Sequence, residues 1–239
     1  MILIGLYIIM KSIIGGKMLS LLNSGLSGIF LVAIIAAFLF ALIISFGFHE
    51  WAHAYVATKQ GDPTPKALGR LTLNPLAHLD PIGTVCLLLI GFGWAKPVPV
   101  NPMNFKNYRK GMFLVSIAGV STNLIMAVVF SFLYVLFTSI ILIDVSTAIG
   151  FFFIQFLLYS TIISFTLAIF NLLPIYPLDG FQALRSFTRY DNQFFRFMEQ
   201  YGMVILIIFL ISPLFDYVFE FAYNIILSPL FQLWQLILV

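Results

Sequence analysis

The sequence predicts an all-α polytopic membrane protein with about four to six transmembrane helices. Of its 239 residues, 62% are hydrophobic and only 9% are charged, whereas a soluble globular domain carries about 25% charged residues. The apolar residues gather into runs that reach the roughly 20 residues needed to cross the hydrocarbon layer. Little sequence remains between these runs, so we expect one membrane-embedded domain over residues 1–239, with its core at about 26–185 and flanking helices in 1–25 and 200–239.

Three apolar runs define the expected core. The first extends from about Leu26 to Phe48, and the second and third cover about Met112–Ile143 and Thr147–Leu173. A short turn whose only charge is Asp144 joins the second run to the third. Because so short a connection makes two helices antiparallel neighbours, these two spans are expected to lie side by side.

A further apolar region follows the core at Met203–Val239. Proline lacks an N–H and disturbs the helix turn before it, so we expect one or two helices here, interrupted at Pro213 and Pro229. The number of spans in this region therefore affects whether the protein has four, five or six transmembrane helices.

The connection between the first and second core spans contains a shorter apolar run, Gly83–Gly93, which is too short to cross the bilayer. The stretch Ala95–Pro102 follows it, and its prolines favour extended chain. We therefore expect a re-entrant loop or a small β-hairpin between these spans. Irregular backbone survives at membrane depth only where protein covers it or where it lines a cavity, so this segment is expected to border a cavity.

Basic residues indicate which side of the membrane each loop occupies. Seven of the 12 Lys and Arg residues lie in Lys59–Lys110 and three in Pro174–Glu199, while the turn at Asp144 has none. Cytoplasmic loops are enriched in Lys and Arg, so both basic segments are expected to face the cytoplasm in a cell-membrane protein. The net charge of +3 then reflects membrane orientation and does not imply a nucleic-acid partner.

The motif that carries chemistry is His49-Glu50-Trp51-Ala52-His53, at the end of the first span. Histidines four residues apart project from one face of a helix, which suits two imidazoles on one zinc ion with Glu50 turned toward water. An ionisable group beside a span costs about 2.5–3.5 kcal/mol and is functional by default. Three such groups in five positions favour a metal site over a solvated helix end, with one Zn²⁺ per chain and Glu50 as general base.

A catalytic zinc ion usually takes three protein ligands, so one more ligand is required. The remaining candidates are His78 and the acidic residues near an apolar boundary, Asp62, Asp80, Asp144 and Asp179. By the distribution of basic residues, Asp144 lies on the opposite side of the membrane from the motif. Asp179 follows the third span on the motif's side, within the irregular stretch Asn171–Gly180, where a buried carboxylate needs a partner. A helix N-cap is an equally sensible role for Asp179, and the residues alone leave both roles open.

Several motifs together resemble the site-2 protease family of intramembrane metalloproteases, in the compact form that lacks PDZ and CBS modules. They are, in order, His49–His53, Asn74–Thr84, Gly93–Pro102, Ala118–Asn123 and Asn171–Gly180, within roughly residues 40 to 185. The resemblance implies that Asp179 is the third zinc ligand. It also places Asn123 near the site, in substrate or oxyanion binding, for which an interhelical hydrogen bond is the alternative. His78 is a further candidate beside the site, with a backbone hydrogen bond as its alternative role.

The resemblance also implies a function and its partners. We expect hydrolysis of peptide bonds within or near transmembrane segments, in single-span regulatory proteins or signal-peptide remnants, by zinc-activated water with Glu50 taking the proton. A helical substrate must first unwind, and the extended Lys96–Val100 segment is a candidate to pair with the opened strand. Two rival functions are a membrane metal transporter, which is expected to spread its polar ligands along a path through the bilayer, and a proteolytically silent scaffold.

Overall fold

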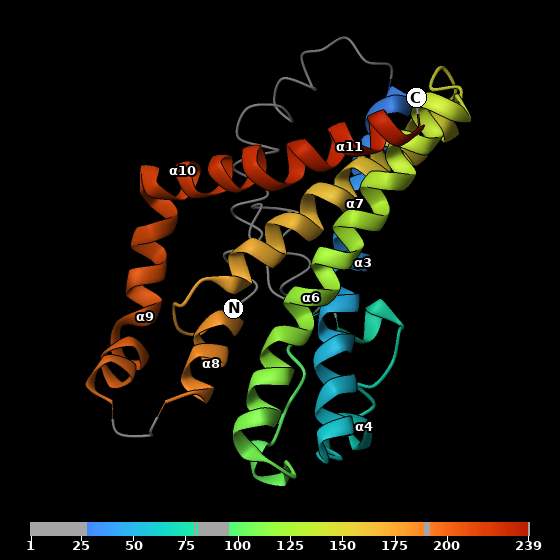
Figure 1. Ribbon diagram of the computed structural model, residues 1–239. Coiled ribbons are helices and arrows are strands. Elements are labelled where there is room, and N and C mark those ends of the chain that lie inside the picture. Colours follow the sequence, from blue (N-terminus) through green and yellow to red (C-terminus); the bar gives the residue numbers. More distant parts are fainter. Residues whose placement is uncertain (1–27, 79, 81–95, 189–191, 239) are drawn as a thin grey trace.

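The computed structural model describes residues 28–78, 80, 96–188 and 192–238, and all regular secondary structure among these residues is helical (Figure 1). Five helices in this part of the chain are long and apolar enough to cross a membrane: Gly28–Gln60, Tyr108–Ile140, Ala148–Leu172, Gln193–Ile211 and Pro213–Leu238. The expected all-α polytopic membrane architecture is therefore confirmed. The expected re-entrant loop or hairpin falls on residues 83–93 and the N-terminal flanking helix on 1–25, and both lie outside the described residues.

Three helices form the centre of the molecule: α3 (Gly28–Gln60), α6 (Tyr108–Val135, continued by the π-helical turn η4, Leu136–Ile140) and α7 (Ala148–Leu172). They lie side by side in Figure 1, and each packs against the other two. Between α3 and α7 the packed side chains are Phe38, Ala41, Leu42, Phe46, Ile163 and Leu167. The small side chain of Ala41 lets the two backbones approach closely, as in other membrane helix pairs.

Helix α3 continues well past the expected end of the first span at Phe48. The twelve residues from His49 to Gln60 include no glycine or proline, so nothing in the local sequence stops the helix there. It ends only at Gly61, whose φ of 112° lies in the region that favours glycine, just before Pro63. The histidine motif consequently sits inside a continuous helix, with helical turns on both sides to hold it.

The C-terminal region forms α9 (Gln193–Ile211), α10 (Pro213–Ala222), the π-helical turn η5 (Tyr223–Leu227) and α11 (Ser228–Leu238). The chain bends sharply at Pro213, as expected, and α10–α11 then run across the upper ends of the other helices in Figure 1. The expected interruption at Pro229 is wrong, because the wider hydrogen-bond spacing of η5 immediately precedes this proline and absorbs its missing N–H. Trp234 of α11 donates a hydrogen bond to Ser131 Oγ on α6 at 2.9 Å.

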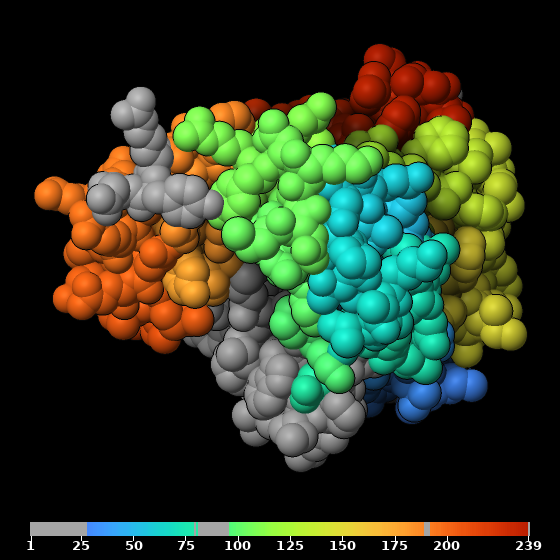
Figure 2. Space-filling model, turned by 90° about the horizontal axis from the view of Figure 1, so that it is seen from below, coloured from blue at the N-terminus to red at the C-terminus, as the bar shows by residue number. Residues whose placement is uncertain are grey.

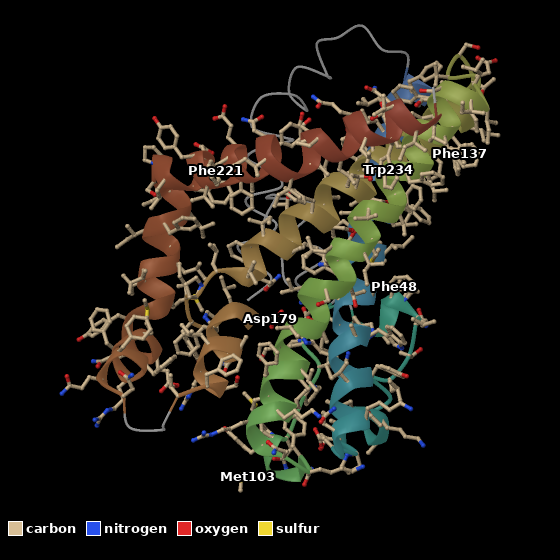
Figure 3. The ribbon with its side chains drawn as sticks, viewed as in Figure 1. Phe48, Met103, Phe137, Asp179, Phe221 and Trp234 are labelled. Carbon is tan, nitrogen blue, oxygen red and sulfur yellow. The ribbon has the colours of Figure 1, made fainter. Side chains whose placement is uncertain are left out.

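Shorter elements gather around the end of α3 that carries the motif. They are α4 (Thr64–Ala67), the 3-10 helices η2 (Pro75–His78) and η3 (Pro102–Asn104), and the extended residues 96–101 between them. Figure 2 shows this end of the molecule, with α4 and the end of α3 against the start of α6. Helix α8 (Asp179–Ser186) follows the loop after α7, and Figure 3 shows Asp179 at its start, in the interior between α8 and α6.

Candidate metal centre

Two imidazoles and one carboxylate converge in the interior of the molecule. The His49 and His53 side chains, one turn apart on α3, bring their Nε2 atoms to 3.0 Å from each other. Asp179 Oδ2 lies 3.2 Å from both Nε2 atoms, and all three residues are buried. Ligand atoms about 2.0–2.1 Å from a tetrahedral zinc ion lie about 3.3 Å apart. The spacing and the donor set of two nitrogens and one oxygen therefore fit one such ion.

The loop after α7 delivers Asp179 to this point. Leu178 and Phe181 on either side are fully buried and anchor the start of α8. A Cβ on Gly180 would lie 2.2 Å from the carbonyl oxygen of Leu172, so only glycine lets α8 begin directly against the end of α7. The N-cap position of α8 belongs to Leu178, and the Asp179 carboxylate turns toward the imidazoles instead of capping the helix.

Helix α6 contacts both imidazoles at their Nδ1 atoms, on the side away from Asp179. His53 Nδ1 lies 2.8 Å from the carbonyl oxygen of Val115, and His49 Nδ1 lies 3.1 Å from Asn123 Nδ2. Gly119 lies between these two positions on the same face, since residues four apart share a helix face. A Cβ on Gly119 would approach His49 Cε1 to 2.5 Å and His53 Nε2 to 2.6 Å. The imidazoles thus pack directly on the α6 backbone, and no larger residue fits at Gly119 without moving them.

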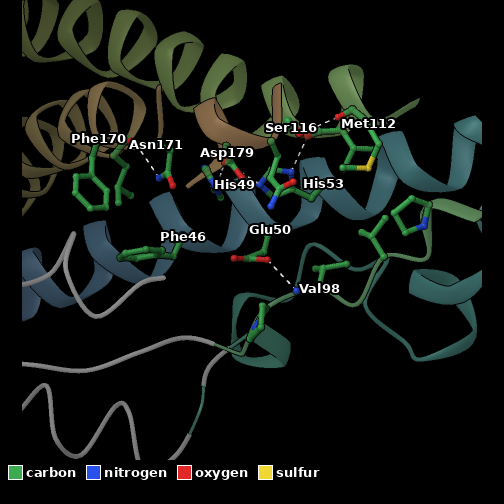
Figure 4. A pocket seen from close by; sticks show the side chains of 16 residues that line it. Phe46, His49, Glu50, His53, Val98, Met112, Ser116, Phe170, Asn171 and Asp179 are labelled. Carbon is green, nitrogen blue, oxygen red and sulfur yellow. Dashed lines mark hydrogen bonds and ion pairs between the residues drawn. The ribbon is translucent and has the colours of Figure 1, made fainter. Parts of the chain in front are cut away.

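Glu50 projects from α3 on the side away from α6, and the extended segment faces it. Glu50 Oε2 accepts a hydrogen bond from the backbone N–H of Val98 at 3.0 Å (Figure 4). Pro97 and Pro99 flank Val98 and have no N–H, so Val98 supplies the only backbone donor of these three residues. Glu50 itself is 6% exposed. Its carboxylate is held next to the converging ligands without joining them.

A cavity of about 380 Å³ opens onto this group. Its polar lining comes from the three ligand candidates and Glu50, together with Ser116, Asn171 and Gln182. Its apolar lining includes Phe46, Pro97, Val98, Val100, Met112, Val115, Leu167 and Phe170. A pocket with mostly apolar walls and a few convergent polar groups is the usual form of a ligand-binding or active site.

Asn123 and His78, the candidates for substrate or oxyanion binding, lie outside the cavity wall. Asn123 is fully buried behind His49, on the α6 side. His78 is 1% exposed, and its Nε2 lies 3.1 Å from the carbonyl oxygen of Thr72. The His78 carbonyl accepts a hydrogen bond from the Lys96 N–H at 2.8 Å. His78 therefore fastens the beginning of the extended segment through its backbone carbonyl, and its side chain does not line the cavity.

Asp62, another candidate for the third ligand, serves as an anchor for the same segment. Its buried carboxylate accepts hydrogen bonds from the Thr64 N–H and hydroxyl, from the Asn101 N–H at 2.7 Å and from Asn104 Nδ2 at 2.8 Å. Burial alone would raise the pKa of Asp62, but these hydrogen bonds outweigh it and hold the pKa below its usual range. Asp62 thus ties the end of the extended segment to the end of α3.

Reasoning from the sequence missed Asn171, Gln182 and Gly119 as parts of the site. A signal existed for Asn171, because it is an amide in an otherwise apolar span end, eight residues before Asp179. It is 7% exposed, and its Nδ2 donates to the Leu167 carbonyl oxygen at 2.9 Å. Gln182 lies one turn beyond Asp179 on α8 and so shares its face. Gly119 could not be identified, because only the helix packing shows what lies against it.

Comparisons with known proteins agree with this geometry. The family model described as peptidase family M50 matches residues 37–212. The "putative zinc metalloprotease YwhC" of Bacillus subtilis is 44% identical over 181 residues, which are 74% of this chain and 81% of the relative. The "putative zinc metalloprotease Rip2" of Mycolicibacterium smegmatis is 30% identical over 205 residues, 82% of this chain and 73% of the relative. The Rip2 protein of Mycobacterium tuberculosis is 30% identical over 196 residues, 78% of this chain and 69% of the relative. No solved structure matches the chain.

Proposed function

Because the chain belongs to peptidase family M50, the site-2 protease family, we propose that it is a zinc protease that hydrolyses peptide bonds within or next to the transmembrane segments of other membrane proteins. One observation carries the proposal: His49, His53 and Asp179 converge beside Glu50 at one cavity among membrane-spanning helices. The names of the relatives supply zinc as the metal. The donor set of two imidazoles and a carboxylate is one that catalytic zinc uses.

The chain's own residues have distinct roles in this reaction. Zinc held by His49, His53 and Asp179 would polarise the peptide carbonyl and make a water molecule easier to ionise. Glu50 takes the proton from the attacking water and then gives it to the leaving amine. Oε2 of Glu50 accepts a hydrogen bond from the Val98 N–H. Oε1 is therefore the oxygen that accepts the proton from water and donates it to the leaving amine. This arrangement orients the carboxylate before the substrate arrives.

We assign the amide that contacts the substrate to Asn171, because Asn171 lines the cavity and Asn123 does not. One of the two N–H groups of its amide is used by the Leu167 carbonyl, so the other is left to donate to the carbonyl oxygen under attack. This replaces the expectation that Asn123 binds the oxyanion.

The cavity is proposed to open toward the cytoplasm. Seven of the 12 Lys and Arg residues lie from the last turn of α3 to the first turn of α6, at the end of the molecule opposite the turn 141–147 (Figure 1). Hydrolysis requires water, and an opening at this end would admit it without exposing the apolar faces of the central helices.

The extended segment is proposed to receive the unwound substrate by strand pairing, but only some of its backbone N–H groups are available for it. The N–H groups of Lys96, Val98 and Asn101 already donate to His78, Glu50 and Asp62 respectively. The Val100 N–H has no hydrogen-bond partner among the described residues, so it is the donor left to pair with a substrate carbonyl. The Val98 N–H can then keep Glu50 oriented while the substrate is bound.

Replacing Glu50 by Gln tests the proposed function. Membrane proteins that carry a defined intramembrane cut in wild-type cells are expected to accumulate intact in the Glu50→Gln strain, as mass spectrometry of the membrane fraction would show. With purified protein and one such substrate in liposomes, the rate is expected to fall about 10²–10⁴-fold, and chelation of zinc is expected to abolish it.

The matched control is Glu220→Gln, which removes an exposed carboxylate from α10, outside the cavity lining, and is expected to cleave like wild type. Unchanged cleavage in Glu50→Gln would refute the protease assignment. Zinc flux through liposomes without any cleavage would favour the transporter instead.

A further inference from the structure

We infer that Asn123 is a positioning residue whose side-chain oxygen accepts the Nδ1–H of His49 and so leaves Nε2 of His49 free to bind the metal. The inference rests on the proposed zinc site and adds to it a residue that touches neither ion nor substrate. Asn123 belongs to α6, is fully buried, and lies 3.1 Å from His49 Nδ1 through its amide.

The first step concerns the proton count on the imidazoles. A neutral imidazole has one N–H and one lone pair. The two Nε2 atoms lie 3.0 Å apart and face the same Asp179 oxygen, so a cation at this point needs the lone pair on both of them. Each imidazole must then carry its proton on Nδ1, and each Nδ1–H needs an acceptor.

His53 satisfies this condition through the backbone. Its Nδ1 lies 2.8 Å from the Val115 carbonyl oxygen. A carbonyl oxygen can only accept, so Nδ1 carries a proton, and in the neutral imidazole the Nε2 lone pair is then left for an ion. Helix α6 thus sets which tautomer the neutral His53 adopts.

His49 depends on Asn123 for the same condition. With the amide nitrogen toward His49, Asn123 Oδ1 is buried without a hydrogen-bond partner among the described residues. A half-turn of the amide exchanges the oxygen and the nitrogen. Each orientation leaves one amide atom unpaired, so hydrogen-bond counting does not choose between them. Metal binding distinguishes the two orientations. Only with the Asn123 oxygen facing His49 Nδ1 is the proton on Nδ1 and the Nε2 lone pair available to the metal.

One face of α6 therefore orients both imidazoles, through Val115, Gly119 and Asn123. Two acceptors flank a glycine, and the glycine lets both imidazoles lie directly on the helix. This arrangement also explains why Asn123 is absent from the cavity wall. An acceptor for His49 Nδ1 must lie on the side of the imidazole away from the ion.

Metal affinity of Asn123 variants tests the inference. The purified protein in detergent would be titrated with Zn²⁺ against a chromophoric chelator. Asn123→Leu, similar in size but without an acceptor, is expected to bind about 10–100-fold more weakly than wild type. Asn123→Asp offers an oxygen in either orientation and is expected to stay within about tenfold of wild type. Ser131→Ala removes another buried polar group from α6, away from the imidazoles, and should bind as wild type does.

The outcomes separate this inference from the proposed function. Wild-type affinity in Asn123→Leu, or equal weakening in the Leu and Asp variants, would overturn the role of Asn123. Wild-type affinity in His49→Ala would instead overturn the metal site itself. If the Leu variant unfolds, the imidazole ¹⁵N spectrum of the zinc-loaded wild type decides alone. A His49 signal with Nδ1–H and coordinated Nε2 is expected, and the reverse assignment would refute the inference.

Discussion

The two sides of the site are built differently. On the α6 side, the imidazoles of His49 and His53 press against helix backbone at Gly119, and their Nδ1 atoms contact residues of the same helix. On the cavity side, Glu50 is held by one hydrogen bond from an extended segment, and that segment is itself fastened through His78 and Asp62. Packed helices thus fix the proposed metal ligands, whereas an irregular segment holds the proposed general base.

This difference separates two kinds of defect. A change on the α6 side moves ligands that cannot relax, so it should reduce metal binding. A change on the cavity side should reduce turnover and leave the metal in place. The three substitutions that follow challenge this division, beginning with the one expected to have the largest effect.

Gly119→Ala is expected to weaken zinc binding by about 100-fold or more, and to lower cleavage accordingly. The new Cβ would lie 2.5 Å from His49 Cε1 and 2.6 Å from His53 Nε2, so both ligands must shift, and displacements of about 1 Å at a reaction centre can cost about 10²-fold in rate. Zinc content after dialysis against a weak chelator is the measurement. Gly28→Ala on α3, where no atom of the described residues lies within 4 Å of the added Cβ, is the control. Normal zinc content in Gly119→Ala would show that the α6 side can relax after all.

Val98→Pro removes the N–H that holds Glu50 and is expected to lower kcat about 10–100-fold with zinc content unchanged. A hydrogen bond to a charged group contributes about 1.5–3 kcal/mol, and proline is compatible with extended chain. Val98→Ala keeps the N–H and should retain most activity. The split between kcat and zinc content distinguishes this variant from a folding defect, and loss of zinc in Val98→Pro would contradict the division between the two sides.

Asp62→Asn is expected to have the smallest effect, a loss of about 1–2 kcal/mol in the stability of the segment that Asp62 anchors. The folded pKa of Asp62 is depressed, so its contribution is present above the unfolded pKa of about 3.9 and is lost as pH falls through the folded value. Limited proteolysis of residues 96–106 between pH 7 and pH 3 is the measurement. Wild type should become more susceptible at the acidic end, whereas the variant should be susceptible already at pH 7 and change less. If wild type and Asp62→Asn are digested identically at pH 7, Asp62 does not anchor the segment.

The central architecture could be predicted from the sequence because it depends on apolar run length. The spans expected at Met112–Ile143 and Thr147–Leu173 correspond closely to α6 with η4 and to α7. The end of the first span was placed at Phe48, too early, because hydropathy falls there while helix-forming residues continue to Gln60. The break at Pro229 was wrong because hydrogen-bond spacing in the preceding turn cannot be read from composition.

The candidate site was predictable in part, for a similar reason. His49, Glu50 and His53 share a local spacing, and Asp179 could be proposed from membrane sidedness and the family resemblance, so these four could be named together. The structure does bring them to one cavity. The side of His49 on which Asn123 lies, and the contact of Val98 with Glu50, depend on how helices and loops pack over long sequence distances. No local pattern encodes that packing.

The late position of Asp179 in the chain has a consequence for biosynthesis. His49 and His53 leave the ribosome early, but the third ligand follows about half a chain later, after α6 and α7 have been made. A nascent polypeptide still in the insertion machinery therefore holds only two of the three ligands. On the proposed function, the chain can complete its ligand set and become hydrolytic only after its central helices have been synthesised.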